Sequence, residues 1–357
     1  MQSLSIDEAK NIRKGEELNL EQLQQYLRTT WQMPDAEINV LQFPSGFSNL
    51  TYLLQFGDKD LVLRRPPFGA ENIQKGHDMG REFKVLSMLQ NCYSKSPKPL
   101  LYTEDKSIIG APFYLMERVK GSIIRAGHEL PFDETQMKRL NQHFLDTLAE
   151  LHTIDIEKSG LIQLGKTEGY LQRQVEGWIQ RYKNAQTDDI PAVNEIMEWF
   201  MSNMPTTQYN AMIHNDYKYD NVVLDPDDNT QIKAVLDWEM ATVGDVWTDF
   251  GTTLAYTSEP SDPAEALKNF GIQLKKGTMS RQEMIEYYEQ KTQRKVENIV
   301  FYYAFALFKL GVIVQQIYFR YKKGYTQDQR FAMLIYLVKD CAHVAHLAIK
   351  SNRISQF

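Results

Sequence analysis

The segment that decides the fold is His214-Asn215-Asp216-Tyr217-Lys218-Tyr219-Asp220-Asn221, and a second acidic segment, Leu236-Asp237-Trp238-Glu239, follows it. Between them stand two apolar runs, VVLD (222–225) and IKAVLD (232–237), separated by the turn-rich sequence PDDNTQ. Asp, Asn and Pro favour tight turns, so the pattern predicts a β-hairpin. The sequence thus places the carboxylate of Asp216, the amide of Asn221 five residues later and the carboxylate of Asp237 around one predicted hairpin.

These residue types suit phosphoryl transfer, which needs an acceptor hydroxyl held in line and a metal that neutralises the phosphate oxygens. Asp216 would orient the hydroxyl and accept its proton. Asn221 and Asp237 would give hard oxygen ligands to Mg²⁺. Lys218 would either neutralise the transferred phosphate or remain a solvated surface lysine. Ordinary turn chemistry is the alternative explanation for the Asp and Asn residues.

The catalytic-loop segment and the run VLDWEMATVGDVWTD (235–249) resemble the aminoglycoside phosphotransferase family of the protein-kinase-like superfamily. The similarity extends from about residue 40 to about residue 255. Within that family the chain looks closest to the kinase-like domains of acyl-CoA dehydrogenase family members. The run VLDWEMATVGDVWTD and the segment GYLQRQVEGW (169–178) are typical of those domains. The resemblance implies an α+β, bilobal protein-kinase-like fold, ATP and Mg²⁺ as cofactors, and a catalytic loop braced by Asp249.

The N-terminal region predicts a sheet. INVLQF (38–43), LTYLLQF (50–56) and LVLRR (61–65) have β-type composition and are separated by turn signals, so they predict an antiparallel meander. A helix is expected over 78–90, with further strands at KPLLYTE (98–104) and PFYLMERV (112–119). Beyond Gly121 the chain is expected to be mainly helical apart from the hairpin. Residues 1–118 would therefore form a nucleotide-binding lobe, and residues 119–357 a larger helical lobe with the catalytic loop and acceptor site.

The predicted nucleotide site lies on this sheet. The turn FPSGFSNLT (43–51) would offer backbone N–H groups to the triphosphate, although a plain hairpin turn has the same composition. Strand alternation places Val62 and Arg64 on one face, toward adenine and phosphate. The family usually has lysine at the position of Arg64, and Glu82 is the expected partner of this cation. The nucleotide-site candidates are Gly46, Ser48, Asn49, Val62, Arg64, Glu82, Glu117 and Val119, the last two through backbone groups that contact adenine.

The acceptor is expected to be a small hydroxylated molecule with negative charge. The segment FKLGVIVQQIYFRYKKG (308–324) is basic, whereas a polycationic aminoglycoside would need an acidic pocket. The resemblance suggests a hydroxy acid or its acyl-CoA thioester, with Arg173 and Arg320 as pocket candidates. Simple surface charge is the alternative for both arginines.

Two other functional classes remain. Arginine at position 64 leaves open a nucleotide-binding pseudokinase that acts as an interaction module. A protein kinase proper is disfavoured because WEMATVGDVWTDFG (238–251) leads directly into a predicted helix without an Ala-Pro-Glu-like segment. His152 is expected to be a helix-end residue that bonds the backbone. The sequence CAHVAH (341–346) is interpreted as ordinary helix rather than a metal site.

Composition narrows the partners and the compartment. The formal net charge of −6 gives no overall attraction to nucleic acid or anionic membranes. Two cysteines cannot build a disulfide framework, which fits the cytoplasm. No apolar signal core begins the chain, and polar residues interrupt its most apolar stretch, 302–319, so neither secretion nor membrane insertion is predicted. The oligomeric state stays open.

Overall fold

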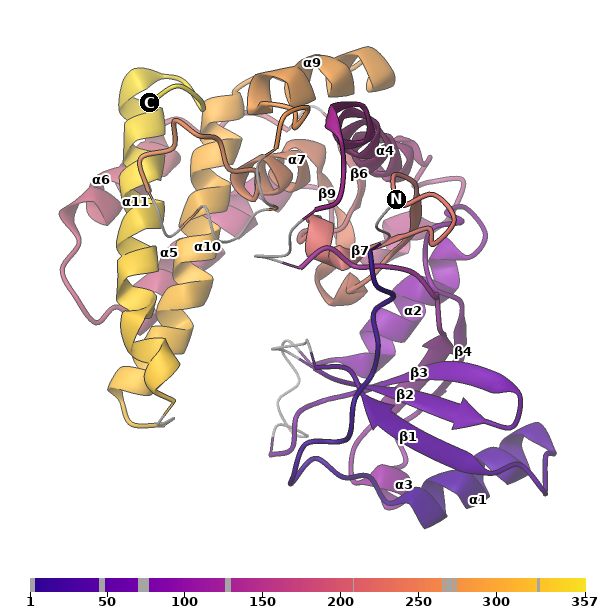
Figure 1. Ribbon diagram of the computed structural model, residues 1–357. Helices are drawn as coiled ribbons and strands as arrows, with labels where there is room; N and C mark the ends of the chain where they lie inside the picture. The colour runs from indigo at the N-terminus through magenta and orange to yellow at the C-terminus, as the bar shows by residue number, and fades with distance from the viewer. Residues whose placement is uncertain are drawn as a thin grey trace. The chain divides into compact units, whose positions relative to one another are not determined.

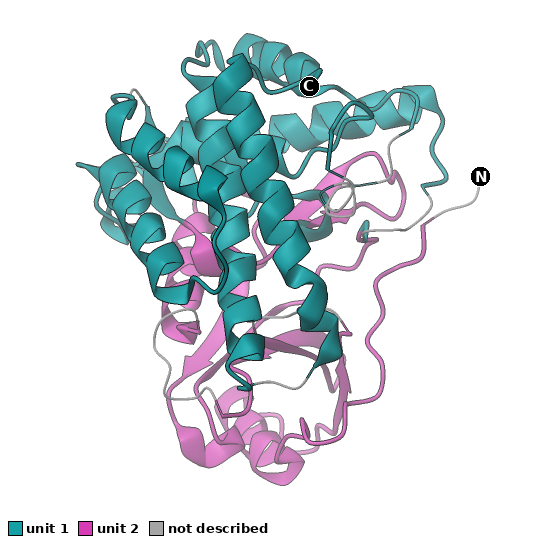
Figure 2. Ribbon diagram, turned by 90° about the vertical axis from the view of Figure 1, so that its left-hand side faces the viewer, with its two compact units in different colours: residues 1–2, 124–221, 242–357 teal, residues 3–123, 222–241 magenta. Residues whose placement is uncertain are grey.

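The computed structural model describes residues 4–44, 49–69, 77–125, 130–207, 209–264, 267, 272, 275–325 and 328–357. The chain forms two compact units (Figure 2). The first, here called the sheet unit, comprises residues 3–123 and 222–241, and the second, the helical unit, comprises residues 1–2, 124–221 and 242–357. The predicted division after residue 118 had assigned 222–241 to the helical lobe, and the structure groups these residues with the N-terminal sheet instead.

A five-stranded sheet in the order β1-β2-β3-β5-β4 forms the centre of the sheet unit (Figure 1). Every neighbouring pair is antiparallel, and β3 lies in the middle with β2 on one side and β5 on the other. The predicted meander and both later strands are confirmed. The strands are β1 (Ile38–Gln42), β2 (Leu50–Phe56), β3 (Lys59–Arg65), β4 (Pro99–Thr103) and β5 (Phe113–Glu117).

The helices of the sheet unit are α1 (Leu20–Trp31), α2 (Met79–Leu89) and α3 (Lys106–Ile109). The predicted α2 begins after Asp78, whose side chain accepts a hydrogen bond from the N–H of Arg81, a typical N-cap. Helix α1 was not predicted. It is amphipathic and contributes Leu23 and Leu27 to the apolar core beneath the sheet.

The hairpin of β7 (Val222–Leu224) and β8 (Ile232–Val235) belongs to the sheet unit through backbone contacts. Ser122 and Leu224 form a β-bridge, and the N–H of Val235 donates to the carbonyl of Lys95 at 2.7 Å. Gly121 permits this approach, because a Cβ there would lie 2.2 Å from the carbonyl oxygen of Leu224. Main-chain pairing therefore carries the segment after the catalytic loop into the sheet unit.

The helical unit contains seven longer helices among its described residues and a small antiparallel sheet of β6 (Asn210–Ile213) and β9 (Thr242–Asp245). This second strand pair was not predicted, and β9 corrects the expectation that the chain passes directly from Asp237 into a helix. Each strand has four residues, too few for alternation to be recognised. The helices are α4 (Glu134–Thr153), α5 (Tyr170–Ala185), α6 (Pro191–Ser202), α7 (Val246–Ala255), α9 (Arg281–Thr292), α10 (Ile299–Lys322) and α11 (Leu334–Ser351), and the short 3-10 turns include η2 (Tyr219–Asn221) in this unit and η3 (Trp238–Met240) in the sheet unit.

Helix α10 is the core helix of the helical unit and packs on α11, α7 and α5; Figure 1 shows α10 and α11 side by side. Two segments, Ile299–Lys322 and Gln329–Ser351, are long and apolar enough to cross a membrane by length and composition. In the first, 78% of the apolar window is buried inside the protein, and in the second 44%. Buried core helices pass the same test, so it does not distinguish a membrane span from the interior seen here.

Candidate active site

The catalytic loop follows β6 in the helical unit and is held by the buried carboxylate of Asp249. Asp249 accepts hydrogen bonds from the backbone N–H groups of His214 and Asn215, both at 2.7 Å. Asn215 adopts a left-handed φ of 68°, a conformation that needs such external support in a residue other than glycine. Burial alone would raise the pKa of Asp249, but hydrogen bonds from His152 and the loop lower it below its ordinary value. Asp249 therefore braces the loop, as the resemblance implied.

Asp216 is oriented through both of its carboxylate oxygens. Tyr256 donates its hydroxyl to Oδ1 at 2.8 Å, and the amide of Asn221 donates to Oδ2 at 2.9 Å. The ammonium of Lys218 lies 3.2 Å from the same Oδ2 and 5.0 Å from the centre of the Tyr256 ring. Lys218 is thus placed against Asp216 rather than left as a solvated lysine. Sequence reasoning missed Tyr256, because no local pattern connects the end of α7 with the loop.

Asn221 directs its amide nitrogen toward Asp216. Its Nδ2 donates to the backbone carbonyl of Asp216 and to the carboxylate, each at 2.9 Å. The amide oxygen of Asn221 consequently points away from Asp216. An amide oxygen is a hard ligand suited to Mg²⁺, so the orientation is compatible with the predicted metal-binding role.

In the sheet unit, Arg64 is buried on β3 and binds three carboxylates. It lies 2.5 Å from Glu82, 3.1 Å from Asp237 and 3.4 Å from Glu239. The predicted pairing with Glu82, from α2, is confirmed. Burial would lower the pKa of Arg64, but the charge of Glu82, followed by those of other nearby groups, holds it well above its ordinary value. Burial raises the pKa of Glu82, against the opposing charge of Arg64.

Asp237 and Glu239 follow β8 and face the same guanidinium. Asp237 has a φ of 67° and begins the turn η3, which contains Glu239. Glu239 also accepts a hydrogen bond from Asn49 at 2.6 Å, and the oxygen of Asn49 lies 2.9 Å from Nδ1 of His77. Glu239 and His77 were not among the predicted site residues, although Glu239 stands inside the quoted motif.

This cluster fits a divalent cation. Three carboxylates gather around one guanidinium in a partly buried place, and carboxylate oxygens are hard ligands that suit Mg²⁺. Within the described residues, no group of three or more His, Cys, Asp or Glu is arranged to hold a metal by itself. Mg²⁺ is commonly bound through one or two carboxylates together with substrate phosphates, which is what Asp237 and Glu239 are able to supply.

The remaining predicted nucleotide residues have different outcomes. Gly46 and Ser48 lie outside the described residues. Val62 is buried two positions before Arg64 on β3 and pairs with Leu53 and Met116, so it keeps the predicted strand setting. Glu117 ends β5, and its N–H donates to the carbonyl of Lys98 at 2.8 Å; Val119 follows the end of that strand.

The two arginines predicted for the acceptor pocket make no contact with Asp216 in the described structure. Arg173 donates to the backbone carbonyls of Glu168 and Lys166, next to its own helix α5. Arg320 is exposed near the end of α10. Their assignment as acceptor ligands stays a prediction.

The histidines set aside from catalysis have structural contacts. His152 was expected to bond the backbone at a helix end, but its ring is fully buried and contacts side chains instead. It lies 2.7 Å from the hydroxyl of Tyr288 and 3.1 Å from Asp249. The prediction was wrong about the partner because α7 and α9 bring these groups to the end of α4. His346 lies 3.1 Å from Glu195 on α6.

Comparison with known proteins gives one family. Residues 39–281 match the sequence model of the phosphotransferase enzyme family. Acyl-CoA dehydrogenase family member 11 of Rattus norvegicus is 35% identical over 292 residues, and member 10 of Mus musculus is 31% identical over 326 residues. These alignments cover 81% and 90% of this chain but only 37% and 30% of the two relatives, so the chain spans about a third of their length.

Solved structures share the fold. A Ralstonia eutropha protein provisionally assigned as an aminoglycoside phosphotransferase has a TM-score of 0.77 at 26% identity, covering 94% of this chain and 99% of that protein. The GDP and kanamycin complex of APH(2'')-IIIa has a TM-score of 0.61 at 18% identity, covering 90% and 99%. The second likeness shows the fold alone. With the family match across residues 39–281, these findings show that the chain belongs to the phosphotransferase enzyme family and has its kinase-like fold.

Proposed function

We propose that this protein is an ATP-dependent kinase that phosphorylates a hydroxyl group of a small anionic molecule. The observation that carries the proposal is the orientation of Asp216 by Tyr256, Asn221 and Lys218 on a loop that Asp249 braces. A carboxylate fixed in this way is suited to hold an acceptor hydroxyl and to take its proton. A base displaced by even an ångström loses much of its effect, so this rigidity supports a catalytic role.

The proposed metal ligands flank the hairpin in the sequence. Val222 pairs with Val235, Asn221 precedes the first of these residues and Asp237 follows the second by two positions. We propose Asn221 and Asp237 as Mg²⁺ ligands, because each offers a hard side-chain oxygen. When bound, the ion would neutralise charge on the nucleotide phosphates. Arg64 would contact those phosphates while Glu82 holds its guanidinium.

A hydroxy acid or a hydroxyacyl-CoA is the proposed acceptor. The support is the similarity to proteins named acyl-CoA dehydrogenase family members and the presence of Lys309, Arg320 and Lys322 on α10. Kanamycin is bound in the structure of APH(2'')-IIIa, which is only 18% identical to this chain. Aminoglycosides are therefore the less favoured class of acceptor in this proposal. We further propose a cytoplasmic protein that binds neither nucleic acid nor membrane.

The test is Mg²⁺-dependent transfer of phosphate from ATP to a panel of hydroxy acids, hydroxyacyl thioesters and kanamycin, with products identified by phosphorus NMR. Phosphorylation of an acid or thioester is expected, and it should disappear when Mg²⁺ is chelated. Tight ATP binding without transfer to any compound would instead favour the pseudokinase alternative, in which the protein acts as an interaction module.

A further inference from the structure

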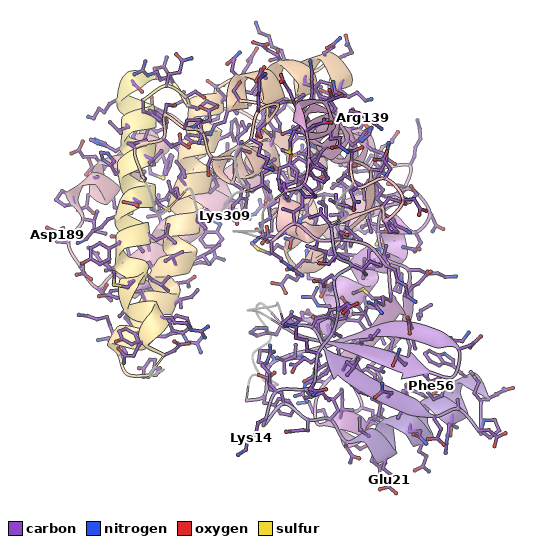
Figure 3. The ribbon with its side chains drawn as sticks, in the orientation of Figure 1. Lys14, Glu21, Phe56, Arg139, Asp189 and Lys309 are labelled. Carbon is purple, nitrogen blue, oxygen red and sulfur yellow. The ribbon has the colours of Figure 1, made fainter. Side chains whose placement is uncertain are left out.

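Lys309 is a buried cation next to the catalytic loop. It lies on α10, where Figure 3 labels it, and only 8% of its surface is exposed. Its ammonium donates to the backbone carbonyl of Asn215 at 2.9 Å, the residue directly before Asp216. Burial lowers the pKa of Lys309, while the negative charges of Asp216 and Asp249 oppose that effect.

The contacts of Lys309 do not use its full capacity. An ammonium carries three hydrogen-bond donors, and the carbonyl of Asn215 accepts one of them. In the described part of the chain, no carboxylate forms a salt bridge with Lys309. A buried cation that no carboxylate contacts directly is costly, so a group that offers negatively charged oxygens to the ammonium would improve this site.

A second cation lies close by on α5. The guanidinium of Arg181 stacks over the ring of Trp178 at 4.6 Å from its centre, and the ammonium of Lys309 lies 5.9 Å from the same ring. The charge of Arg181 also contributes to the lowered pKa of Lys309. Two helices thus bring two like charges to one indole, and neither charge has an acidic partner among the described residues.

We infer that Lys309 and Arg181 form the subsite for the negatively charged group of the acceptor, a carboxylate or a phosphate, beside Asp216. Lys309 binds the anionic oxygens, and Arg181 adds positive charge beside it. The subsite sets specificity by holding the acceptor so that its hydroxyl reaches Asp216. This inference rests on the proposed kinase function and assigns the anion to residues other than Arg173 and Arg320.

A purely structural role for Lys309, support of the Asn215 carbonyl, predicts different behaviour. A support residue affects all acceptors equally, whereas an anion ligand affects charged acceptors more than neutral ones. Straight-chain hydroxy acids of increasing length, each paired with its own primary amide, separate these roles. Hydroxyalkyl phosphates of the same lengths distinguish a carboxylate from a phosphate source.

The experiment measures binding of these compounds to the full chain by calorimetry. Because charge-assisted contacts are involved, the best acid or phosphate should bind the wild type about 10-fold or more tightly than its amide. Lys309→Met and Arg181→Met should reduce that preference several-fold, and Lys309→Arg should keep most of it. Arg181 is exposed, so its variant tests the subsite even if Lys309→Met fails to fold. Lys322→Met, the same change at an exposed lysine of α10, is the matched control and should keep the preference.

Equal binding of acid and amide, no binding of any anion, or an equal loss for acid and amide in the variants would overturn the subsite. Transfer from ATP in the wild type is measured separately. Phosphoryl transfer without a binding preference for anionic acceptors would contradict the subsite alone. A clear preference for anionic acceptors without any phosphoryl transfer would contradict the proposed kinase function.

Discussion

At the scale of single residues, both oxygens of Asp216 have partners within the chain itself. A carboxylate has about four lone-pair directions, so the contacts with Tyr256, Asn221 and Lys218 leave room for an acceptor hydroxyl. Asp216→Asn should keep nucleotide affinity within a few-fold, because the side chain is nearly isosteric. Phosphoryl transfer should fall by about 100-fold or more, as an amide cannot accept the proton. Single-turnover transfer and nucleotide titration measure the two effects.

Asp220→Asn is the matched control for this prediction. Asp220 lies on the same loop, 3.9 Å from Lys218, and undergoes the same chemical change. Its transfer rate should stay within a few-fold of the wild type. Wild-type transfer by Asp216→Asn would show that Asp216 is not the base.

Arg64 tests whether shape matters beyond charge. Its Nη1 contacts Glu82 and Asp237, and its Nη2 contacts Asp237 and Glu239. A lysine ammonium has equal charge but cannot span these partners in the same way, so Arg64→Lys should bind ATP more weakly than the wild type. Arg64→Ala should weaken ATP binding and slow transfer further, because Glu82 then keeps no cationic partner.

Nucleotide titrations and phosphoryl-transfer rates of Arg64→Lys and Arg64→Ala test whether the shape of the guanidinium matters beyond its charge. If lysine restores full activity, charge alone is sufficient at this position. If both variants match the wild type in affinity and turnover, the proposed placement of the phosphate site along β3 is wrong.

At the scale of elements, His152 connects three helices. The ring belongs to α4 and contacts Asp249 of α7 and Tyr288 of α9. Burial lowers its pKa below the ordinary value of 6.5, against the opposing effect of Asp249. The unfolded chain therefore binds a proton more readily at this position, and stability should be lost as the pH falls below about 6.5. His152→Gln should show a smaller drop in thermal midpoint between about pH 7.5 and pH 5.5 than the wild type.

His346→Gln provides the comparison for that measurement. His346 lies on α11, is partly exposed and contacts Glu195, so its replacement should leave most of the pH dependence unchanged. An equally steep acid loss in His152→Gln would mean that groups other than His152 account for it. The pKa of Asp249 is lowered in the fold, so its own contribution should be lost only as the pH falls through the lower, acidic range.

Elements were predictable where the pattern was local. The strands β2 and β3 have β-type composition and clear turn signals at their ends, and α2 has an N-cap and apolar spacing. The strands β6 and β9 are short and pair across a long separation in sequence, so no window of sequence reveals them. Helix α1 was missed although it is amphipathic: its side chains are mostly polar, and only Leu23 and Leu27 are fully buried.

The residues of the candidate site also differ in how far the sequence predicts them. Asp216, Lys218 and Asn221 stand within one short segment, so their spacing could be interpreted from the sequence. Tyr256 and Lys309 reach the loop from helices α7 and α10, and only the packing of those helices brings them there. Side chains that come from distant helices have no sequence signature of their own.

At the scale of the whole chain, the hairpin decides which residues meet. The chain leaves the sheet unit near residue 123, forms the catalytic loop and then returns for residues 222–241. This return brings Asp237 and Glu239 to Arg64, which belongs to the N-terminal part of the sequence. A single boundary between two lobes could not predict that residues 222–241 belong to the sheet unit. Boundaries based on composition assume that each lobe is continuous in sequence.

The acidic cluster at Asp237 predicts that metal and nucleotide stabilise the protein together. A ligand that binds only the folded state adds about 2.7 kcal/mol when its concentration is about 100 times its Kd. ATP should therefore raise the thermal midpoint of the wild type more with Mg²⁺ than with a chelator, because the ion neutralises charge on the nucleotide phosphates. In Asp237→Ala the difference between these two conditions should largely vanish. That difference is insensitive to the baseline stability lost with the Arg64 contact. Asp225→Ala, the same change in the same hairpin at a carboxylate paired with Lys233, should keep it. An undiminished Mg²⁺-dependent rise in Asp237→Ala would place the metal at other ligands.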